Sequence, residues 1–456
     1  MDFHERRRLR QTIRSARQSL VSGRTSSQIL VEEALERILD PAGEGKRAFT
    51  KAYAEGARES ANEADKKKTY SESAIAGLPI SIKDLFDVAG EVTLAGSKAL
   101  AKAKPARCDA EVVTRLKRAG AIIVGRTNMS EFAFTGVGMN PHHGAPANPY
   151  DRECRRIPGG SSSGAPVSIS DGMALAAIGT DTGGSVRIPA ALCGLTGFKP
   201  TQRRVPRAGV FPLSPTLDSV GVVASTVSCC AQVDGVLADE CWRENEIPLN
   251  SKTYAVPTNY FLDELDPQVA TVFQSAISRL SAAGARIVDV VLPEIEQITA
   301  INARGGISAP EAYAYHHQLG ADFDLYDPLV RERILRGKDV SANEYLEMLE
   351  TRKRLIAVFG RESGWYFLLC PTVPIIAPEI AALEKDANLY RRVNRMLLRN
   401  PNVVNFLDGC ALTIPCHDEG SAPVGLMTVG RTLQDKTLLN VGLAIERTLS
   451  DQRQSD

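Results

Sequence analysis

Two short loops of small residues stand apart from the rest of the chain, at residues 159–164 (GGSSSG) and 179–185 (GTDTGGS). Glycine weakens helices and strands, so such clusters mark turns or places where backbone must approach a ligand closely. Two chemistries use loops of this kind. One is the binding of a phosphate by backbone N–H groups, and the other is an oxyanion hole beside a serine nucleophile.

The phosphate interpretation is the weaker one, because neither loop matches Gly-x-x-x-x-Gly-Lys-Ser/Thr and no Gly-x-Gly-x-x-Gly follows a clear strand here. Residues 160–164 do fit the esterase string Gly-x-Ser-x-Gly. In esterases this string forms a sharp turn between a strand and a helix, which needs an apolar strand directly before it. Residues 155–159 (RRIPG) do not have the apolar character of such a strand. A Ser-His-Asp triad also needs a histidine. The chain has only six, which argues against that triad without excluding it: His4, His142, His143, His316, His317 and His417.

Lys83 offers a different base. In the predicted strand 79–83 (PISIK), Ile80 and Ile82 point to one face while Ser81 and Lys83 point to the other. Burial can lower the pKa of a lysine from about 10.4 toward roughly 7–8, which makes it a usable general base. A lysine of an edge strand that reaches solvent fits the same local pattern, and the two interpretations stand level.

These segments resemble the motifs of the amidase signature family. Residues 159–162 and 179–190 (GTDTGGSVRIPA) look like the signature itself, and residues 78–84 (LPISIKD) resemble the lysine strand of that family. Further landmarks are similar at residues 197–201 (GFKPT), 215–221 (PTLDSVG), 370–372 (CPT) and 423–427 (PVGLM). The likeness runs from about residue 25 to residue 449, nearly the whole chain.

The resemblance implies a Ser–cis-Ser–Lys triad. Ser185 would be the nucleophile, Ser161 the bridging serine after a cis Gly160–Ser161 peptide, and Lys83 the base. No metal or organic cofactor is implied. The oxyanion hole would consist of four backbone N–H groups, those of Thr182, Gly183, Gly184 and Ser185. One departure is Pro166, where the family mostly has a small helical residue; proline is tolerated in the first turn of a helix.

Other residues near these motifs have competing interpretations. Arg187 could bind a substrate carboxylate, but a structural pair with Asp181 or another buried acid is favoured. Asp84 points away from the Lys83 face and is expected to be structural. Packing or surface roles are expected for the remaining candidates, although the resemblance places some of them near the substrate: His142, His143, Tyr313, His316, His317 and, as a core residue, Cys193.

Composition excludes several classes of protein. Lys+Arg and Asp+Glu both number 54, so there is no general attraction for nucleic acid or anionic membranes. The most apolar uncharged stretch, residues 364–378, is too short for a membrane span and contains three prolines. The N-terminus is basic without a secretory h-region, and Arg6, Arg7, Arg8 and Arg10 are expected on a solvated helix face. Nine cysteines without a Cys-x-x-Cys pair indicate mostly buried free thiols in the cytoplasm.

The positioning elements alternate between helix and strand. The first forty residues predict helices, including one that begins with a Thr25–Gln28 capping box, and residues 65–73 predict a solvated loop. Further helices are expected at 109–119, 267–284, 342–359 and 437–449, and strands at 121–125, 286–292, 366–370, 410–415 and 423–429. This order predicts an α/β/α sandwich with a large mixed sheet covered on both faces. We expect one domain over residues 1–456, with a helical extension (1–60), a core (78–220) and substrate-side helices plus the remaining sheet (221–456).

The resulting functional hypothesis is a cytoplasmic amidohydrolase acting on a small-molecule amide, without nucleic acid or membrane; a homodimer remains open. The alternative is the glutaminase subunit of a tRNA-dependent amidotransferase, which shares the signature and would require partner subunits. A non-catalytic relative is disfavoured, since Lys83, Ser161 and Ser185 are all present. The amide itself is not specified by any motif, and indole-acetamide, aryl-amide, malonamide-like and urea-derived substrates remain open.

Overall fold

All strands within the described residues belong to one sheet. The computed structural model describes residues 11–303, 305–359 and 364–451. Residues 1–10, with the predicted solvated face of Arg6, Arg7, Arg8 and Arg10, lie outside the described residues. In chain order the eleven strands are β1 (Phe49–Ala52), β2 (Pro79–Lys83), β3 (Ile122–Thr127), β4 (Ala176–Asp181), β5 (Thr196–Lys199), β6 (Ser219–Ala224), β7 (Thr253–Pro257), β8 (Arg286–Val290), β9 (Phe367–Pro371), β10 (Cys410–Pro415) and β11 (Gly425–Gly430).

The sheet is mixed, with the order β1-β3-β2-β4-β6-β5-β10-β11-β9-β7-β8. Strand β2 lies between β3 and β4 and is parallel to both. Strands β7, β8 and β9 form a second parallel group, while β4, β6, β5, β10, β11 and β9 pair antiparallel in sequence along the sheet. The position of β2 places its residues in the interior of the sheet and away from an edge.

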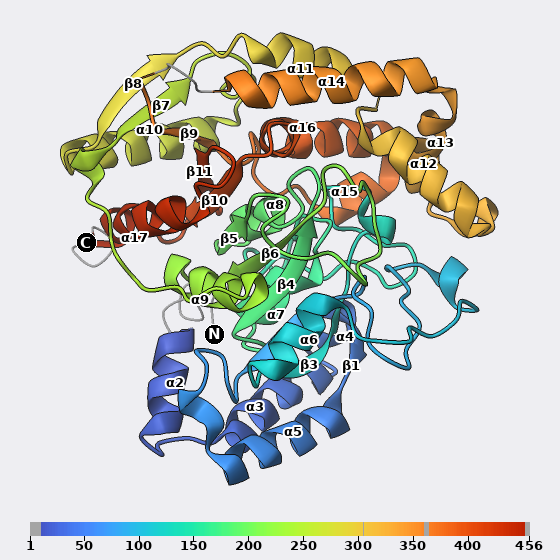
Figure 1. The fold of residues 1–456 in the computed structure, drawn as a ribbon, viewed down its shortest axis with the longest axis vertical. Coiled ribbons are helices and arrows are strands. Elements are labelled where there is room, and N and C mark those ends of the chain that lie inside the picture. Colours follow the sequence, from blue (N-terminus) through green and yellow to red (C-terminus); the bar gives the residue numbers. More distant parts are fainter. Residues whose placement is uncertain (1–10, 304, 360–363, 452–456) are drawn as a thin grey trace.

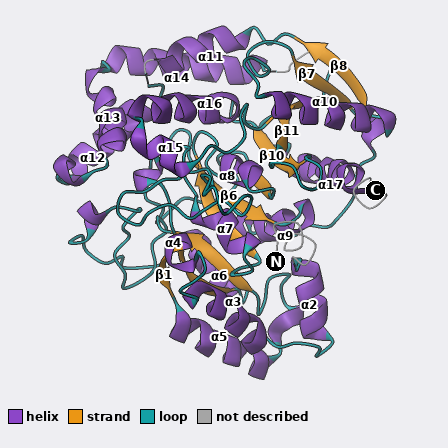
Figure 2. Ribbon diagram, turned by 180° about the vertical axis from the view of Figure 1, so that it is seen from behind, coloured by secondary structure: helices purple, strands orange, loops and turns teal. Residues whose placement is uncertain are grey.

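Helices surround this sheet (Figure 1). They are α2 (Ile13–Val21), α3 (Ser27–Leu39), α4 (Gly45–Ala48), α5 (Ala54–Lys67), α6 (Glu111–Arg118), α7 (Gly164–Ser170), α8 (Arg187–Leu192), α9 (Val227–Ala238), α10 (Pro267–Ala282), α11 (Glu294–Ala303), α12 (Ser308–Leu319), α13 (Pro328–Leu335), α14 (Ala342–Val358), α15 (Ile380–Lys385), α16 (Ala387–Phe406) and α17 (Asp435–Asp451). Figures 1 and 2 show α2, α3 and α5 at one end of the molecule and α11 to α14 at the other.

Both faces of the sheet are covered, because alternate residues of each strand point to opposite sides. On β10, Leu412 belongs to an apolar cluster that also includes α6, α9, α10 and α17, whereas Ala411 belongs to one that includes α11, α14 and α16. Residues of α7 and α8 pack on the latter side, against Ala177 of β4. The predicted α/β/α sandwich with a mixed sheet is therefore confirmed.

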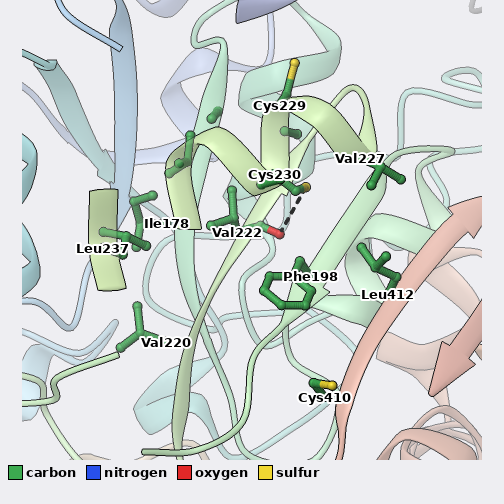
Figure 3. Packing of buried hydrophobic residues seen from close by; sticks show 14 of the residues in the cluster. Ile178, Phe198, Val220, Val222, Val227, Cys229, Cys230, Leu237, Cys410 and Leu412 are labelled. Atoms are coloured by element: carbon green, nitrogen blue, oxygen red, sulfur yellow. Dashed lines mark hydrogen bonds between the residues drawn. The ribbon is translucent and has the colours of Figure 1, made fainter. Parts of the chain in front are cut away.

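The larger of these clusters shows how the strands and α9 exclude water (Figure 3). Its members alternate along the strands, as expected for one face of a sheet, and each is almost fully buried. Burial of such side chains stabilises the fold by about 1.5–3 kcal/mol each. The residues labelled in the view include Ile178, Phe198, Val222 and Leu412 from the sheet and Val227, Cys230 and Leu237 from α9.

Two local predictions in the N-terminal helices need correction. The cap of α3 is Ser26, whose side chain accepts the Ile29 N–H, so the helix does not begin with a Thr25 box. The expected loop at 65–73 is in part helix, because α5 continues to Lys67 before a left-handed residue at Lys68. Its Asp65 accepts the N–H groups of Ser27 and Gln28 (2.7 and 3.0 Å) and so satisfies the first turn of α3.

The remaining predicted elements are present with shifts of a few residues at their ends, as the bounds above show. Strand β3 at the predicted 121–125 segment is parallel to β2 but antiparallel to β1. Asp266 caps α10, with Pro267 in its first turn. Pro166 is the third residue of α7, within the first turn, so the departure from the family pattern is accommodated.

All nine cysteines are free, and six of them are buried. Among the described helices, none combines the length and apolar character that a membrane crossing requires.

Candidate active site

Three segments bring the predicted triad together. Lys83 ends β2, Ser161 lies in the loop before α7, and Ser185 lies in the loop between β4 and α8. Because β2 and β4 are parallel neighbours, the loops after them meet at the same edge of the sheet. The backbone N–H of Ser162 donates to the carbonyl oxygen of Ser185 (3.3 Å), which joins the two serine loops directly.

Lys83 is fully buried and hydrogen-bonded to two hydroxyl groups. Its Nζ donates to Ser161 Oγ (2.7 Å) and to Thr180 Oγ1 (3.0 Å). Burial lowers the pKa of Lys83 to about 7, against the opposing attraction of the Asp181 and Asp218 carboxylates. A substantial fraction of the amine is therefore neutral near pH 7 and able to accept a proton.

The backbone around Ser161 is held by neighbouring loops. The Gly160–Ser161 peptide is cis, as the resemblance implies. The Gly160 N–H donates to the carbonyl oxygen of Gly136 (2.8 Å), and the carbonyl oxygen of Ser161 accepts the Ser130 N–H (2.9 Å). These two hydrogen bonds hold the backbone of the loop in the position from which the Ser161 hydroxyl reaches Lys83.

The loop of Ser185 is organised by a buried carboxylate. Asp181 accepts the N–H groups of Gly184 (2.8 Å) and Val186 (3.1 Å), the two residues that flank Ser185. Gly184 has a φ of +126°, and a Cβ there would come within 2.6 Å of the Pro401 side chain. Only glycine fits this position, because other residues rarely adopt that conformation and the space is already filled.

The expected donors of the oxyanion hole differ in their hydrogen bonds. The Gly184 N–H donates to Asp181 Oδ1 (2.8 Å) and so already has an acceptor within the protein. Within the described residues the backbone N–H groups of Thr182, Gly183 and Ser185 have no hydrogen-bond acceptor. These three residues also line one cavity, so their N–H groups are the remaining candidates for the hole.

Arg187 and Asp84 have the structural roles that the sequence favoured. The Arg187 guanidinium bonds Asp181 at two points (2.9 and 3.0 Å), and both side chains are fully buried. Asp84 is buried beside Arg126 (3.4 Å) and accepts the Gly96 N–H (3.3 Å). Burial raises the pKa of Asp84 to about 6. Neither side chain lines the cavity next to Ser185.

The histidine candidates of the described residues occupy packed or surface positions away from the cavity at Ser185. His142 Nε2 lies 2.7 Å from Glu131 Oε1, and His143 is partly buried beside it. His316 is fully buried against Phe132, and burial lowers its pKa to about 4. His317 is exposed and stacks on Tyr313. None of these rings lines the cavity at Ser185, and the Cys193 thiol is buried and donates to the Pro158 carbonyl oxygen (3.3 Å).

The cavity at Ser185 has a volume of about 350 Å³. A larger hollow beside β1 and α5 contains no member of the triad, so size does not identify the site. Thr182, Gly183 and Ser185 form one wall of the smaller cavity. The lining also includes charged and polar residues that no sequence motif identified, from α13, the residue after it and α16: Glu332, Arg333, Arg336, Tyr390, Arg391, Asn394, Arg395, Arg399 and Asn402.

A signal for part of that wall was present in the sequence. Arg391, Arg395 and Arg399 recur at four-residue intervals, a spacing that places side chains on one face of a helix. Such a run normally indicates a solvated face, so the spacing alone does not predict a cavity wall. Among the described residues no group of three or more His, Cys, Asp or Glu side chains is arranged to hold a metal ion.

Comparisons with known proteins agree with this geometry. The family model described as Amidase matches residues 30–439. The chain is 39% identical to a 2-amino-5-chloromuconic acid deaminase of Comamonas testosteroni over 81% of each chain, and 32% identical to a glutamyl-tRNA(Gln) amidotransferase subunit of Roseiflexus sp. (strain RS-1) over 96% of each. A solved structure described as an amidase superimposes with a TM-score of 0.85 at 30% identity, over 96% of this chain and 99% of that one. The chain therefore belongs to the amidase family and is an amide-hydrolysing enzyme.

Proposed function

We propose that this enzyme hydrolyses a small carboxamide to a carboxylate and ammonia or an amine through a serine acyl-enzyme. The observation that carries the proposal is the 2.7 Å hydrogen bond between Lys83 and Ser161, buried beside the loop of Ser185. Free cysteines throughout the described chain support a cytoplasmic location.

In the proposed reaction, neutral Lys83 accepts the proton of Ser161, and Ser161 takes the proton of Ser185 as that hydroxyl attacks the amide carbonyl carbon. The carbonyl oxygen becomes an oxyanion, stabilised by N–H groups among Thr182, Gly183 and Ser185. The proton then returns along the same relay to the leaving nitrogen, because expulsion of an unprotonated amine is unfavourable. Water attacks the acyl-enzyme by the same route and releases the carboxylate and Ser185.

The nucleophile assignment is tested by substitution and covalent labelling. Ser185→Ala is expected to abolish amide hydrolysis without unfolding the protein, and a fluorophosphonate probe is expected to label the natural protein at Ser185. Ser163→Ala is the matched control, since its hydroxyl is buried in the neighbouring loop and has no hydrogen-bond partner among the described residues. Labelling at another residue, or normal turnover by Ser185→Ala, would show that the assignment is wrong.

A second candidate is the glutaminase subunit of an amidotransferase, favoured by the match to the Roseiflexus amidotransferase protein over 96% of both chains. A panel of small amides that includes glutamine separates the two functions. A free-standing hydrolase turns over some member of the panel without tRNA, ATP or partner proteins. Glutaminase activity that appears only with partner subunits would replace the preferred function but keep the same triad.

A further inference from the structure

The lining of the cavity at Ser185 carries an excess of positive charge. Five arginines and one glutamate line it, from α13 and the residue after it and from α16, two segments far apart in the chain. Glu332 is already paired, with Arg336 (2.7 Å) and with Arg391 (2.8 Å). The remaining three arginines, Arg333, Arg395 and Arg399, have no carboxylate within ion-pair distance among the residues that the structure describes.

Arg333 has a buried donor that is unused among the described residues. Its Nη1 atom is buried without a hydrogen bond among the described residues, and the guanidinium lies over the ring of Phe134 (4.6 Å). Burial lowers the pKa of Arg333 to about 10, so the group is still cationic at neutral pH. Arg333 as a whole is half-buried, but its buried Nη1 group lacks an acceptor, which makes this position an attractor for an anion.

The other two arginines, Arg395 and Arg399, add positive charge that no carboxylate of the described residues neutralises. Arg399 donates only to neutral oxygens, those of the Asn400 side chain (3.1 Å) and the Phe261 backbone (3.3 Å). Arg395 is exposed and lines the same cavity. The wall of the cavity also contains apolar side chains, including Phe134, Leu329 and Leu398. A ligand of this cavity therefore meets cationic side chains, apolar side chains and the Ser185 hydroxyl.

We propose that the substrate is an anionic amide, a half-amide of a dicarboxylic acid or a close analogue, whose free carboxylate is bound by Arg333. This inference rests on the proposed amidohydrolase function and adds the chemical class of the substrate. The planar guanidinium can bind a carboxylate through two parallel hydrogen bonds. The volume of about 350 Å³ is in the range of sites for small molecules.

The test compares substrates that have the same shape and differ only in charge. Each half-amide from succinamate to adipamate is assayed beside its neutral diamide, in which a second carboxamide replaces the carboxylate. The natural enzyme is expected to favour at least one half-amide by about tenfold or more in kcat/KM, because a charge-assisted bond is lost with the diamide. Equal turnover of every pair would overturn the inference but leave the amidohydrolase function intact.

Substitutions of single arginines test which side chain binds the carboxylate of the substrate. Arg333→Gln is expected to raise KM for the half-amide by about 10- to 100-fold with little change for the diamide, and Arg333→Lys to restore part of the preference. Arg331→Gln is the matched control, since this arginine is on the same helix but pairs with Asp324 and does not line the cavity. If Arg333→Gln is unstable, Arg395→Gln at an exposed position is expected to weaken the preference in the same direction. A preference that survives all of these changes contradicts the assignment.

A binding measurement separates the inference from the proposed function. Calorimetry on Ser185→Ala, which cannot form an acyl-enzyme, is expected to show binding of dicarboxylates between succinate and adipate and its loss in Arg333→Gln. Absence of binding for the whole series overturns the charge inference even if Ser185 is labelled by the fluorophosphonate. Binding without labelling or turnover of any amide instead contradicts the proposed function.

Discussion

The carboxylate of Asp181 is bound at two points by Arg187 and at the same time accepts the N–H groups on both sides of Ser185. Burial by itself would raise the pKa of Asp181, but the charge and hydrogen bonds of Arg187 hold it well below its usual range. The carboxylate therefore stays ionised. It positions the loop of Ser185 and, through its charge, limits how far burial lowers the pKa of Lys83.

Removal of Arg187 should leave a buried carboxylate without its counter-ion. Arg187→Met is expected to reduce the free energy of unfolding by about 3–5 kcal/mol, because breaking one partner of a buried pair costs more than the pair contributes. Urea unfolding followed by tryptophan fluorescence measures this. Arg187→Lys keeps the charge but not the two-point geometry, so its free energy of unfolding should lie between those of the natural protein and Arg187→Met. An Arg187→Met variant as stable as the natural protein would show that the pair has no structural role.

Lys83 should control the pH dependence of hydrolysis. If the neutral amine is the base, activity requires loss of its proton, so kcat/KM should rise with pH through an apparent pKa near about 7. Lys83→Ala should reduce kcat/KM by several orders of magnitude. Lys83→Arg should not rescue it, because a guanidinium stays protonated. Retained activity in Lys83→Arg would contradict the Ser–Ser–Lys mechanism even with Ser185 confirmed as the nucleophile.

Thr180 is expected to change the pKa of Lys83 without contacting the substrate. Its hydroxyl oxygen accepts a hydrogen bond from Lys83 Nζ (3.0 Å), which favours the protonated amine. Thr180→Val removes this acceptor at nearly constant volume. The rising limb of the pH–rate profile should then move to lower pH by up to about one unit. Thr180→Ser keeps the hydroxyl and should keep the natural profile; an unshifted limb in the Val variant means that Thr180 is not coupled to the base.

Gly184 should tolerate no side chain. A Cβ would meet Pro401 and Ile188 at 2.6 and 2.7 Å in a backbone conformation with positive φ. Gly184→Ala is therefore expected to lower both the thermal midpoint and the activity, with a stability loss of roughly 1–3 kcal/mol or more. Gly183→Ala is the control for folding, because its nearest contact would be 3.4 Å. Equal thermal midpoints for the two variants would contradict this account of the loop.

Local sequence patterns were most reliable where backbone chemistry decides the outcome. The Asp266–Pro267 start and the end at Gly284 predicted α10 to within two residues. The start of α3 was predicted one residue early, because Thr25 and Ser26 are both good caps and only the bond from Ile29 distinguishes them. The loop at 65–73 was mispredicted in part, since its lysines suggested solvent while Asp65 bonds the first turn of another helix.

The sequence by itself supplied the catalytic candidates, because its resemblance to the amidase signature family implies roles for Lys83, Ser161 and Ser185 without knowledge of the fold. Two properties were decided only by the tertiary structure. Lys83 is buried because β2 lies between β3 and β4, and strand order depends on contacts between distant segments. The arginines of α13 and α16 share a cavity although they are some sixty residues apart, for example Arg333 and Arg395. A local pattern records which face of an element a side chain occupies, but burial and charge balance depend on what packs against that face.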